Sequence, residues 1–396
     1  MRILNIIHDE KFIDNIIRYH DLTKDSASHD YIIINIRSKD KFKYIKSKER
    51  ITQCRPYNFI SFISKNRYDA IIIHNLISIP SKLVPKIPTG IPVFWVSWGM
   101  DIYSLPEHNP IVSLNLHHTI TVNEIKRNKA TTSGIIQQIK RFITCIISGE
   151  SLFSERRQKD YIKAIERINY FSGVIPDEYD YLIDKPFFNA KKFTYQYLNP
   201  SSFNIKPAIP SKKKQIIIGN SSVYTNNHLD VFEILKHLNI TDFDIYLPLN
   251  YGGNPEYCTK LISTGHTLWR DTFHPITSFM PLNAYNAMLD QCSHAIFYHE
   301  RQQAMGNIYR LLETGCKVFL SETNLTYKFL SNLGIKVFSI QSELNQKNID
   351  SPLQHSDALN NQDIVYRLTR DKSAAIKKLT DIYETITEFN QNNAKQ

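Results

Sequence analysis

The sequence predicts an α/β fold with two domains, and three observations support this prediction. The chain has 396 residues, more than a single hydrophobic core usually serves. Hydrophobic residues make up 42% and charged residues 22%, as in ordinary globular proteins. Short apolar runs alternate with stretches long enough for helices, which is typical of βαβ units with buried parallel strands. The runs are Ile3–Ile7, Tyr31–Ile36, Ala70–Ile73, Val93–Val96, Ile216–Ile218, Asp244–Leu247, His294–Tyr298, Lys317–Leu320 and Lys336–Ile340.

Helices and a linker are expected between these strands. Asp9–Tyr19 and Asn226–Leu238 have suitable lengths for helices. The stretch 191–214 contains three prolines, ends in three lysines and shows neither period, so we interpret it as the linker between domains. This interpretation gives a first domain at 1–190, a second domain at 215–362, and a helical C-terminal segment at 363–396 that we expect to pack back on the first domain.

The charge of the chain favours an anionic partner. Lys and Arg number 48 against 38 Asp and Glu, which gives a net charge of +10. Nucleic acid, acidic lipid or a phosphorylated substrate would each suit this excess. The segment 120–167 is the most basic part, and its Lys and Arg residues alternate with Ile and Phe. It therefore predicts an amphipathic, basic surface.

Cysteine usage and hydropathy indicate the compartment. The five cysteines are far apart and form no C-x-x-C pair, so neither a disulfide framework nor a zinc site is predicted. Acidic residues appear too early for a signal peptide, and no apolar run approaches 18 residues. We expect a cytoplasmic protein that is soluble or peripheral to a membrane.

A first candidate site follows the apolar run Ile216–Ile218 and precedes an expected helix. Ligands of open parallel sheets bind beyond the carboxyl ends of strands, where glycine permits close backbone approach and small polar groups contact phosphates or sugar hydroxyls. The alternative is a plain turn in which Asn226 or Asn227 caps the helix. The candidate residues here are Gly219, Asn220, Ser221, Asn227 and His228.

A second candidate site follows the run His294–Tyr298. Arg301, with the amides of Gln302 and Gln303 and the helix start near Gly306, could hold a diphosphate without a metal. The alternative is that Glu300 and Arg301 only decorate a solvated loop.

A third candidate lies in the Gly- and Pro-rich loop after Asp244–Leu247. Tyr251 or Tyr257 could stack on a base, although such a composition also suits an ordinary turn. Pro248 and Asn254 belong to the same loop.

Three residues of the first half are candidates for a general base. Asp101, His74 and Asp9 each follow an expected strand, where a carboxylate or imidazole can accept a proton from a sugar hydroxyl. The alternatives are a hydrogen-bonded structural histidine and a helix-capping aspartate.

Four motifs occur in order between about residues 91 and 339. They are Trp98-Gly99-Met100-Asp101-Ile102-Tyr103, Ile218-Gly219-Asn220-Ser221 with Asn227-His228, Pro248 with Tyr251, Asn254 and Tyr257, and Arg301-Gln302-Gln303-Ala304-Met305-Gly306. Together they resemble glycosyltransferase family 56, which transfers N-acetylfucosamine (Fuc4NAc) from its dTDP donor to lipid II of enterobacterial common antigen synthesis. The last motif is the most specific.

The resemblance implies a GT-B fold, in which two Rossmann-like domains face each other across a cleft. It implies that the first domain binds the acceptor, an undecaprenyl-diphosphate-linked oligosaccharide, and that the second binds a dTDP-sugar. It also implies catalysis without metal or cofactor at the inner face of the cytoplasmic membrane. We expect the segment 120–167 to meet that anionic surface.

The resemblance also assigns roles to the candidates. Arg301 would stabilise the departing diphosphate, Asp101 is the first choice as base, and Asp9 or His74 is the second. Trp98 and Gly99 would bind the acceptor. The donor would contact Gly219, Asn220, Ser221, Asn227, His228, Pro248, Tyr251, Asn254, Tyr257, Gln302, Gln303 and Gly306.

Two other classes of protein fit the sequence less well. A nucleic-acid-binding protein without catalysis would explain the charge, but no RNP, zinc or helix-turn-helix motif is present. A dinucleotide-dependent oxidoreductase would need G-x-G-x-x-G after the first strand, and none occurs. We therefore expect an enzyme with no nucleic-acid partner.

Overall fold

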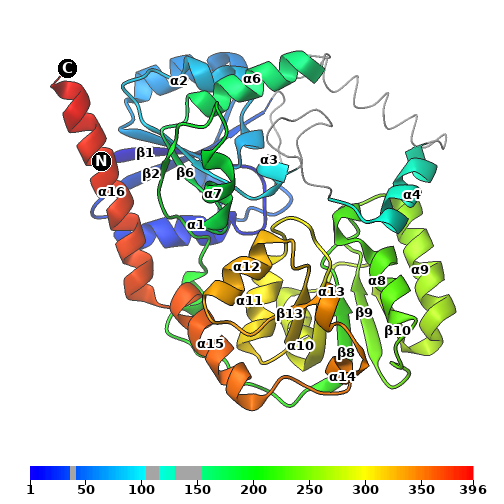
Figure 1. Ribbon diagram of the computed structural model, residues 1–396. Coiled ribbons are helices and arrows are strands. Elements are labelled where there is room, and N and C mark those ends of the chain that lie inside the picture. Colours follow the sequence, from blue (N-terminus) through cyan, green and yellow to red (C-terminus); the bar gives the residue numbers. More distant parts are fainter. Residues whose placement is uncertain (36–41, 104–115, 130–153, 396) are drawn as a thin grey trace. The chain divides into compact units, whose positions relative to one another are not determined.

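The computed structural model of the protein contains two compact units, each built on a parallel β-sheet (Figure 1). It describes residues 1–35, 42–103, 116–129 and 154–395. Of these, unit 1 holds the residues up to 103 with 154–205 and 369–395, and unit 2 holds 116–129 and 206–368. The predicted α/β fold is confirmed.

The sheet of unit 1 has seven strands in the order β3-β2-β1-β4-β5-β6-β7. All neighbouring strands are parallel, and β4 is buried along its whole length, which explains its continuous apolar sequence. The strands are β1 (Arg2–Ile6), β2 (Ser28–Ile34), β3 (Ile51–Cys54), β4 (Ala70–His74), β5 (Val93–Val96), β6 (Tyr170–Ser172) and β7 (Lys191–Lys192).

Helices surround this sheet, and the C-terminal helix α16 belongs to them. Leu379 and Ile382 of α16 are buried in one cluster with Ile3 and Phe94 of the sheet. The α-helices are α1 (Ile13–His20), α2 (Phe59–Asn66), α3 (Met100–Tyr103), α6 (Ser154–Glu166), α7 (Asp177–Ile183) and α16 (Lys372–Ala394). Short 3₁₀ helices are η1 (Asp21–Thr23), η2 (Lys48–Arg50), η3 (Pro56–Asn58), η4 (Leu76–Ser78), η5 (Ser81–Lys86) and η6 (Pro200–Ser202).

The sheet of unit 2 has six parallel strands in the order β10-β9-β8-β11-β12-β13. The order reverses between β8 and β11, and ligands of doubly wound sheets bind at such a point. The strands are β8 (Lys213–Ile218), β9 (Asp244–Pro248), β10 (Phe273–Ile276), β11 (Cys292–Phe297), β12 (Lys317–Leu320) and β13 (Phe338–Ser339).

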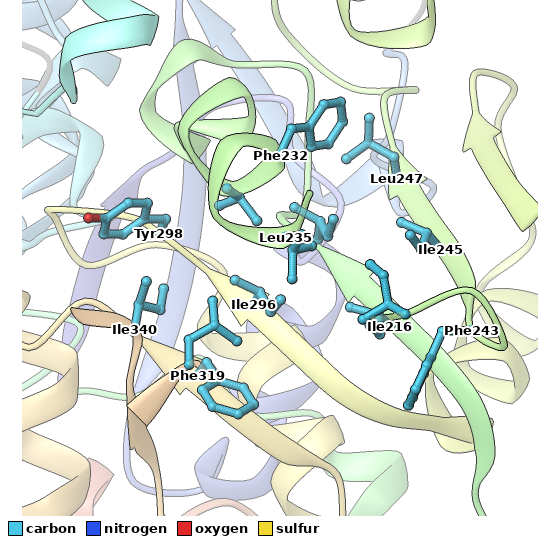
Figure 2. Packing of buried hydrophobic residues seen from close by; sticks show 14 of the residues in the cluster. Ile216, Phe232, Leu235, Phe243, Ile245, Leu247, Ile296, Tyr298, Phe319 and Ile340 are labelled. Atoms are coloured by element: carbon cyan, nitrogen blue, oxygen red, sulfur yellow. The ribbon is translucent and has the colours of Figure 1, made fainter. Parts of the chain in front are cut away.

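The helices of unit 2 cover both faces of its sheet. In Figure 1, α8 and α9 lie on one side of β8, and α10 and α11 lie on the other. Figure 2 shows Phe232 and Leu235 of α8 packed on Ile216, Ile245 and Ile296 of the strands. The helices are α4 (Thr119–Lys129), α8 (His228–Leu235), α9 (Pro255–Trp269), α10 (Leu282–Gln291), α11 (Met305–Glu313), α12 (Leu325–Asn332), α13 (Ile340–Glu343), α14 (Gln346–Ile349), α15 (His355–Thr369), η7 (Tyr224–Asn226) and η8 (Arg270–Thr272).

The helix α4 is not part of the first domain, contrary to the predicted boundary at 190. It belongs to unit 2, although its sequence lies between strands of unit 1. Asp230 explains this placement, because its carboxylate accepts hydrogen bonds from the backbone N–H groups of Ile120 and Thr121, both at 3.0 Å. These are donors in the first turn of α4, so a distant residue caps the helix.

The predicted linker at 191–214 is also wrong at both ends. Lys191 and Lys192 pair with β6, and Tyr195, Leu198 and Phe203 are buried in the core of unit 1. At the other end, Lys213 already starts β8. Aromatic burial therefore holds most of this stretch in unit 1, and the chain changes unit at residues 205 and 206.

The predicted C-terminal segment 363–396 contains parts of two helices. Its first part belongs to α15, which packs on unit 2 through Ala358, and only α16 packs on unit 1. The chain returns to unit 1 at Thr369.

The basic segment 120–167 does not form one element. Lys126 and Arg127 lie on α4 of unit 2, whereas Arg156 and Lys159 lie on α6 of unit 1. Lys140, Arg141 and the apolar residues between the two helices are outside the described residues. Within the described ranges, no helix combines the length and the apolar character that crossing a bilayer requires.

Candidate active site

The loop after β8 is built around Gly219 and Asn226. Gly219 has φ +63°, and a Cβ there would lie 2.6 Å from Asn226 Oδ1 and 2.8 Å from His228 Nε2. Glycine is therefore required for both the backbone conformation and the space. The Asn226 side chain accepts from the N–H of Asn220 at 3.0 Å and donates to the carbonyl of Ser221 at 3.0 Å. Asn226 thus fixes the loop and is not the helix cap.

Gln303 joins the loop after β8 to the loop after β11. Its Nε2 donates to Asn220 Oδ1, and its Oε1 accepts from Thr225 Oγ1, both at 2.8 Å. The structure therefore brings Asn220 and Gln303 together, as two predicted donor-binding residues should be. They bind each other, so their direct role toward a ligand stays a prediction.

Both polar atoms of the Asn227 side chain form hydrogen bonds within the protein. Its Nδ2 donates to the carbonyls of Tyr298 at 2.8 Å and Leu116 at 3.2 Å, and its Oδ1 accepts from His118 N at 3.0 Å. This bridge attaches the segment before α4 to the ends of β8 and β11. The predicted donor contact is therefore not supported for Asn227.

Four predicted residues between the end of β9 and the start of α9 have different roles. Asn254 is the N-cap of α9, because its Oδ1 accepts from Glu256 N at 2.7 Å. Tyr257 is completely buried, and its ring packs on Tyr224 with 4.3 Å between centroids. Tyr257 therefore cannot stack on a base as predicted, because the core holds its ring. Tyr251 is 41% exposed and remains the candidate, whereas Pro248 is buried at the end of β9.

The start of α11 is open. Ala304, at φ +63°, precedes the helix, Gly306 is exposed, and a Cβ on Gly306 would meet nothing within 4 Å. The first N–H groups of an α-helix lack partners inside the helix and favour anions. Arg301 is half-buried three residues before Ala304. A guanidinium and a helix start thus lie in one short segment, as a phosphate site requires.

Three buried polar atoms near these loops have no hydrogen-bond partner among the described residues. They are His228 Nε2, Gln302 Oε1 and His117 Nδ1. Burial lowers the pKa of His228 to about 3, so its ring is neutral. Buried polar atoms are almost always paired, so an unpaired one indicates a place where a ligand or water can bind. This observation favours the carboxyl edge of β8 and β11.

Asp101 of unit 1 lies on α3, the helix that follows β5, and is completely buried. Oδ1 accepts from Ser97 Oγ and Trp98 N, both at 2.9 Å, and Oδ2 accepts from Leu76 N at 3.0 Å and Trp95 Nε1 at 2.6 Å. Burial raises the pKa of this carboxyl, and the four hydrogen bonds oppose that effect. The contacts favour a structural role, which joins the loops after β4 and β5.

His74 and Asp9 are also engaged. The His74 ring bonds Asn5 Oδ1 at 3.1 Å and the Tyr197 hydroxyl at 3.0 Å, and burial lowers its pKa to about 3. Asp9 accepts from the backbone N–H groups of the loop 43–45. Neither arrangement favours the predicted general base.

The two predicted acceptor residues lie beside Asp101. Trp98 is half-buried, and its Nε1 donates to the Tyr197 hydroxyl at 2.6 Å. Gly99 has φ +81° and donates to Ser97 Oγ at 2.9 Å. Their acceptor role stays a prediction.

Known proteins resemble both units. Residues 187–371 match the family model described as 4-alpha-L-fucosyltransferase, glycosyl transferase group 56, which confirms the predicted resemblance. The protein is a glycosyltransferase. The matched segment contains the whole sheet of unit 2 with Gly219, Arg301 and Gly306.

Solved structures show the same fold over the whole chain. A glycosyltransferase from Rickettsia africae is 13% identical, with 98% of each chain covered and a TM-score of 0.57. Anabaena HepE, in complex with UDP and glucose, is 10% identical over 97% of this chain and 100% of that one, with a TM-score of 0.59. WaaG, a glycosyltransferase of lipopolysaccharide biosynthesis, is 10% identical over 97% of this chain and 99% of its own, with a TM-score of 0.56. Two parallel sheets and these neighbours confirm the GT-B fold.

Further candidate residues could not be found from the sequence. His117 and His118 precede α4, and no pattern in the sequence places them at the end of β11. Glu300 was seen only as a loop residue, yet it is buried and hydrogen-bonded to His118 Nε2 at 2.7 Å. Only the fold brings these residues together.

Glu178 is a missed residue of unit 1. It follows β6, and its Oε2 accepts from Val174 N at 2.7 Å. Burial raises the pKa of Glu178 to about 7, even though backbone hydrogen bonds oppose the shift. A carboxyl that titrates near neutral pH has the proton affinity that a general base needs.

The described residues include no group of three or more His, Cys, Asp or Glu side chains placed to hold a metal ion.

Proposed function

We propose that this glycosyltransferase moves a 4-amido-4,6-dideoxyhexose, such as Fuc4NAc, from a dTDP-sugar to an undecaprenyl-diphosphate-linked glycan. The observation that carries the proposal is the family match over residues 187–371, which includes Arg301, Gln302, Gln303 and Gly306 beside the open start of α11. The UDP and glucose in the Anabaena neighbour support a nucleotide-sugar donor.

The donor would lie at the carboxyl edge of β8 and β11. Its diphosphate would meet Arg301 and the first N–H groups of α11, while Gly219, Asn220 and Ser221 would line the loop beside it. Negative charge grows on the diphosphate as the glycosidic bond breaks, and fixed positive groups stabilise that transition state. Tyr251 would lie near the base.

Arg301 would supply the positive charge that a divalent metal supplies in other transferases. We therefore expect EDTA to leave the rate unchanged. Loss of activity with EDTA and recovery with Mg²⁺ or Mn²⁺ would contradict this expectation.

The base that accepts the proton of the acceptor hydroxyl would come from unit 1. Asp101, Asp9 and His74 are the predicted candidates, and all three are engaged in hydrogen bonds. Glu178 is an additional candidate because its pKa is about 7. A transfer that retains the anomeric configuration would not need such a base.

Nucleotide binding tests the donor directly. Ligands that bind the folded state raise the melting temperature, so we would compare dTDP, UDP, GDP and NAD on the full chain. We expect the largest shift with dTDP, and a smaller one for the Arg301→Ala variant. A preference for NAD would contradict the proposal. Filter binding would test the alternative function, a nucleic-acid-binding protein without catalysis, which rests only on the net charge.

The acceptor would place the enzyme at the inner face of the cytoplasmic membrane. α4 exposes Lys126 and Arg127, and each basic residue near an anionic surface contributes about 1 kcal/mol. We expect the protein to sediment with anionic liposomes at low salt and less after both residues are changed to Glu. Changing the exposed Lys328 and Lys347 to Glu is the matched control. A wild type that ignores anionic liposomes would contradict membrane docking but not glycosyl transfer.

A further inference from the structure

His118 lies against the ends of β8 and β11, although it precedes α4 in the sequence. Its backbone N–H donates to Asn227 Oδ1 at 3.0 Å. Its ring stacks on Tyr298, with 3.9 Å between centroids and 21° between planes. Two independent contacts therefore fix both the backbone and the plane of the ring.

Glu300 fixes the remaining freedom of the His118 ring. His118 Nε2 lies 2.7 Å from Glu300 Oε1. That oxygen also accepts from Ser321 Oγ at 2.7 Å, and Glu300 Oε2 accepts from Thr323 Oγ1. Burial alone would raise the pKa of Glu300, but hydrogen bonds from His118, Thr323 and Ser321 outweigh it and lower that pKa. Glu300 is therefore ionised, and the hydrogen of His118 Nε2 points to it.

The second ring nitrogen of His118 is available. Nδ1 makes no hydrogen bond to the described residues, and the side chain is 29% exposed. A carboxylate that fixes one nitrogen of a histidine orients the other one. A histidine that carries a hydrogen on both nitrogens can donate a charge-assisted hydrogen bond to a phosphate, and that bond is stronger than a neutral one.

Arg301 lies at the same edge of the sheet. It follows Glu300 in the chain. Burial is the main cause of the lowered pKa of His117, the neighbour of His118, and the charge of Arg301 lowers it further. Asn324 donates to the carbonyls of His299 and Arg301, both at 2.7 Å, and so holds this turn in place. The hydrogen bond from His118 to Glu300 therefore places His118 beside the residue that precedes Arg301.

We propose that His118 Nδ1–H donates a hydrogen bond to the sugar-bearing phosphate of the donor, and that Glu300 is the positioning residue for His118. This inference rests on the proposed dTDP-sugar donor. It names a second cationic contact beside Arg301, supplied by a segment that the sequence separates from unit 2 by β6 and β7.

The chain offers a matched control for this pair. His274 Nε2 lies 2.7 Å from Asp244 Oδ1, the same distance as in the His118 pair. Asp244 is the first residue of β9, so this second pair lies at the opposite edge of the same sheet. His274→Gln therefore removes a similar pair without touching the proposed site.

The test measures the affinities of dTDP and dTMP by calorimetry on the full chain. His118→Gln keeps an amide able to reach Glu300 but removes Nδ1. We expect it to weaken dTDP binding roughly 10-fold or more and dTMP binding less than about 2-fold, because dTMP lacks the second phosphate. Glu300→Gln should weaken dTDP binding in the same selective way, and His274→Gln should change neither affinity.

Two results would overturn the inference. One is unchanged dTDP affinity in His118→Gln. The other is an equal loss for dTDP and dTMP, which would show a structural role only. If His118→Gln does not fold, as judged by thermal unfolding, His118→Asn and Glu300→Gln provide the same comparison. A wild type that binds neither nucleotide would instead contradict the proposed donor.

Discussion

The carboxyl edges of the two sheets carry similar polar residues that are used differently. In unit 1, both oxygens of Asp101 and both ring nitrogens of His74 have hydrogen-bond partners. In unit 2, His228 and Gln302 each keep a buried polar atom without one. An engaged buried group stabilises a fold, whereas an unpaired one costs free energy that a ligand can recover. Within the described residues of unit 1, Glu178 Oε1, which follows β6, is such an unpaired buried atom. The residues that follow β6, β8 and β11, rather than Asp101 and His74, are therefore the places to look for ligand contacts.

The largest expected effect is that of Arg301→Ala in unit 2. Loss of one group that stabilises a developing negative charge typically costs about 2.7–4 kcal/mol of barrier, or roughly 100- to 1000-fold in turnover. Steady-state kinetics at saturating donor measure it, with thermal unfolding as the check on folding. Near-wild-type turnover would contradict a role of Arg301 in stabilising the departing diphosphate.

Asp101→Asn tests the structural interpretation of unit 1. In the variant, the new NH₂ group must face a hydrogen-bond donor that faces a carboxylate oxygen in the wild type. We therefore expect the free energy of unfolding to fall by about 3 kcal/mol. We expect turnover per folded molecule to be largely kept. Urea unfolding and active-site-normalised kinetics measure the two effects. A stable but inactive variant would instead make Asp101 the base.

Glu178→Gln is the paired variant, for which we expect the opposite outcome, a stable protein with low turnover.

His74 predicts a pH dependence of stability for unit 1. Burial first, and the nearby His29 second, lower the folded pKa of His74 to about 3, whereas the unfolded value is about 6.5. The unfolded chain then binds the extra proton, so stability is complete above pH 6.5 and falls as the pH drops toward 3. The loss at pH 5 is about 2 kcal/mol.

The variant His74→Gln checks this prediction. Between pH 6.5 and 4, the slope of its unfolding free energy against pH should be smaller than that of the wild type by the equivalent of one bound proton. Urea unfolding at several pH values measures this slope. An unchanged slope in His74→Gln would mean that this ring is not kept neutral by burial.

The smallest expected effects are those of alanine substitutions at two glycines of unit 2. Gly219→Ala places a Cβ against Asn226 and His228 at positive φ, so we expect a loss of about 1–2 kcal/mol in unfolding free energy. Gly306→Ala meets open space within a helix, where Ala is favoured by up to about 1 kcal/mol. We expect it to stay folded and yet to weaken dTDP binding, because its methyl group would occupy the open space at the helix start where we propose the diphosphate. Equal dTDP affinity would place the diphosphate elsewhere.

Much of the fold was predictable because buried parallel strands have continuous apolar sequences. The runs at β1, β4, β5 and β11 are of this kind, and the observed bounds agree with the predicted ones for β5 and lie within two residues of them for the others. β3, β6, β7 and β10 were missed. β7 consists of two exposed lysines, and β10 is interrupted by a proline, so neither has an apolar run to find.

By itself, the sequence determined the α/β class, two Rossmann-like sheets, and the residues that follow β8, β9 and β11. Hydrophobic periodicity and turn chemistry are local properties, and a chain expresses them wherever it is placed. The tertiary structure alone decided that Tyr257 is core, that Asp101 is engaged on both oxygens, and that α4 and His118 join unit 2. These outcomes depend on partners more than 100 residues away for α4 and His118, and on three-dimensional burial for Tyr257 and Asp101. Burial and long-range hydrogen bonding are properties of the packed chain, so no local pattern records them.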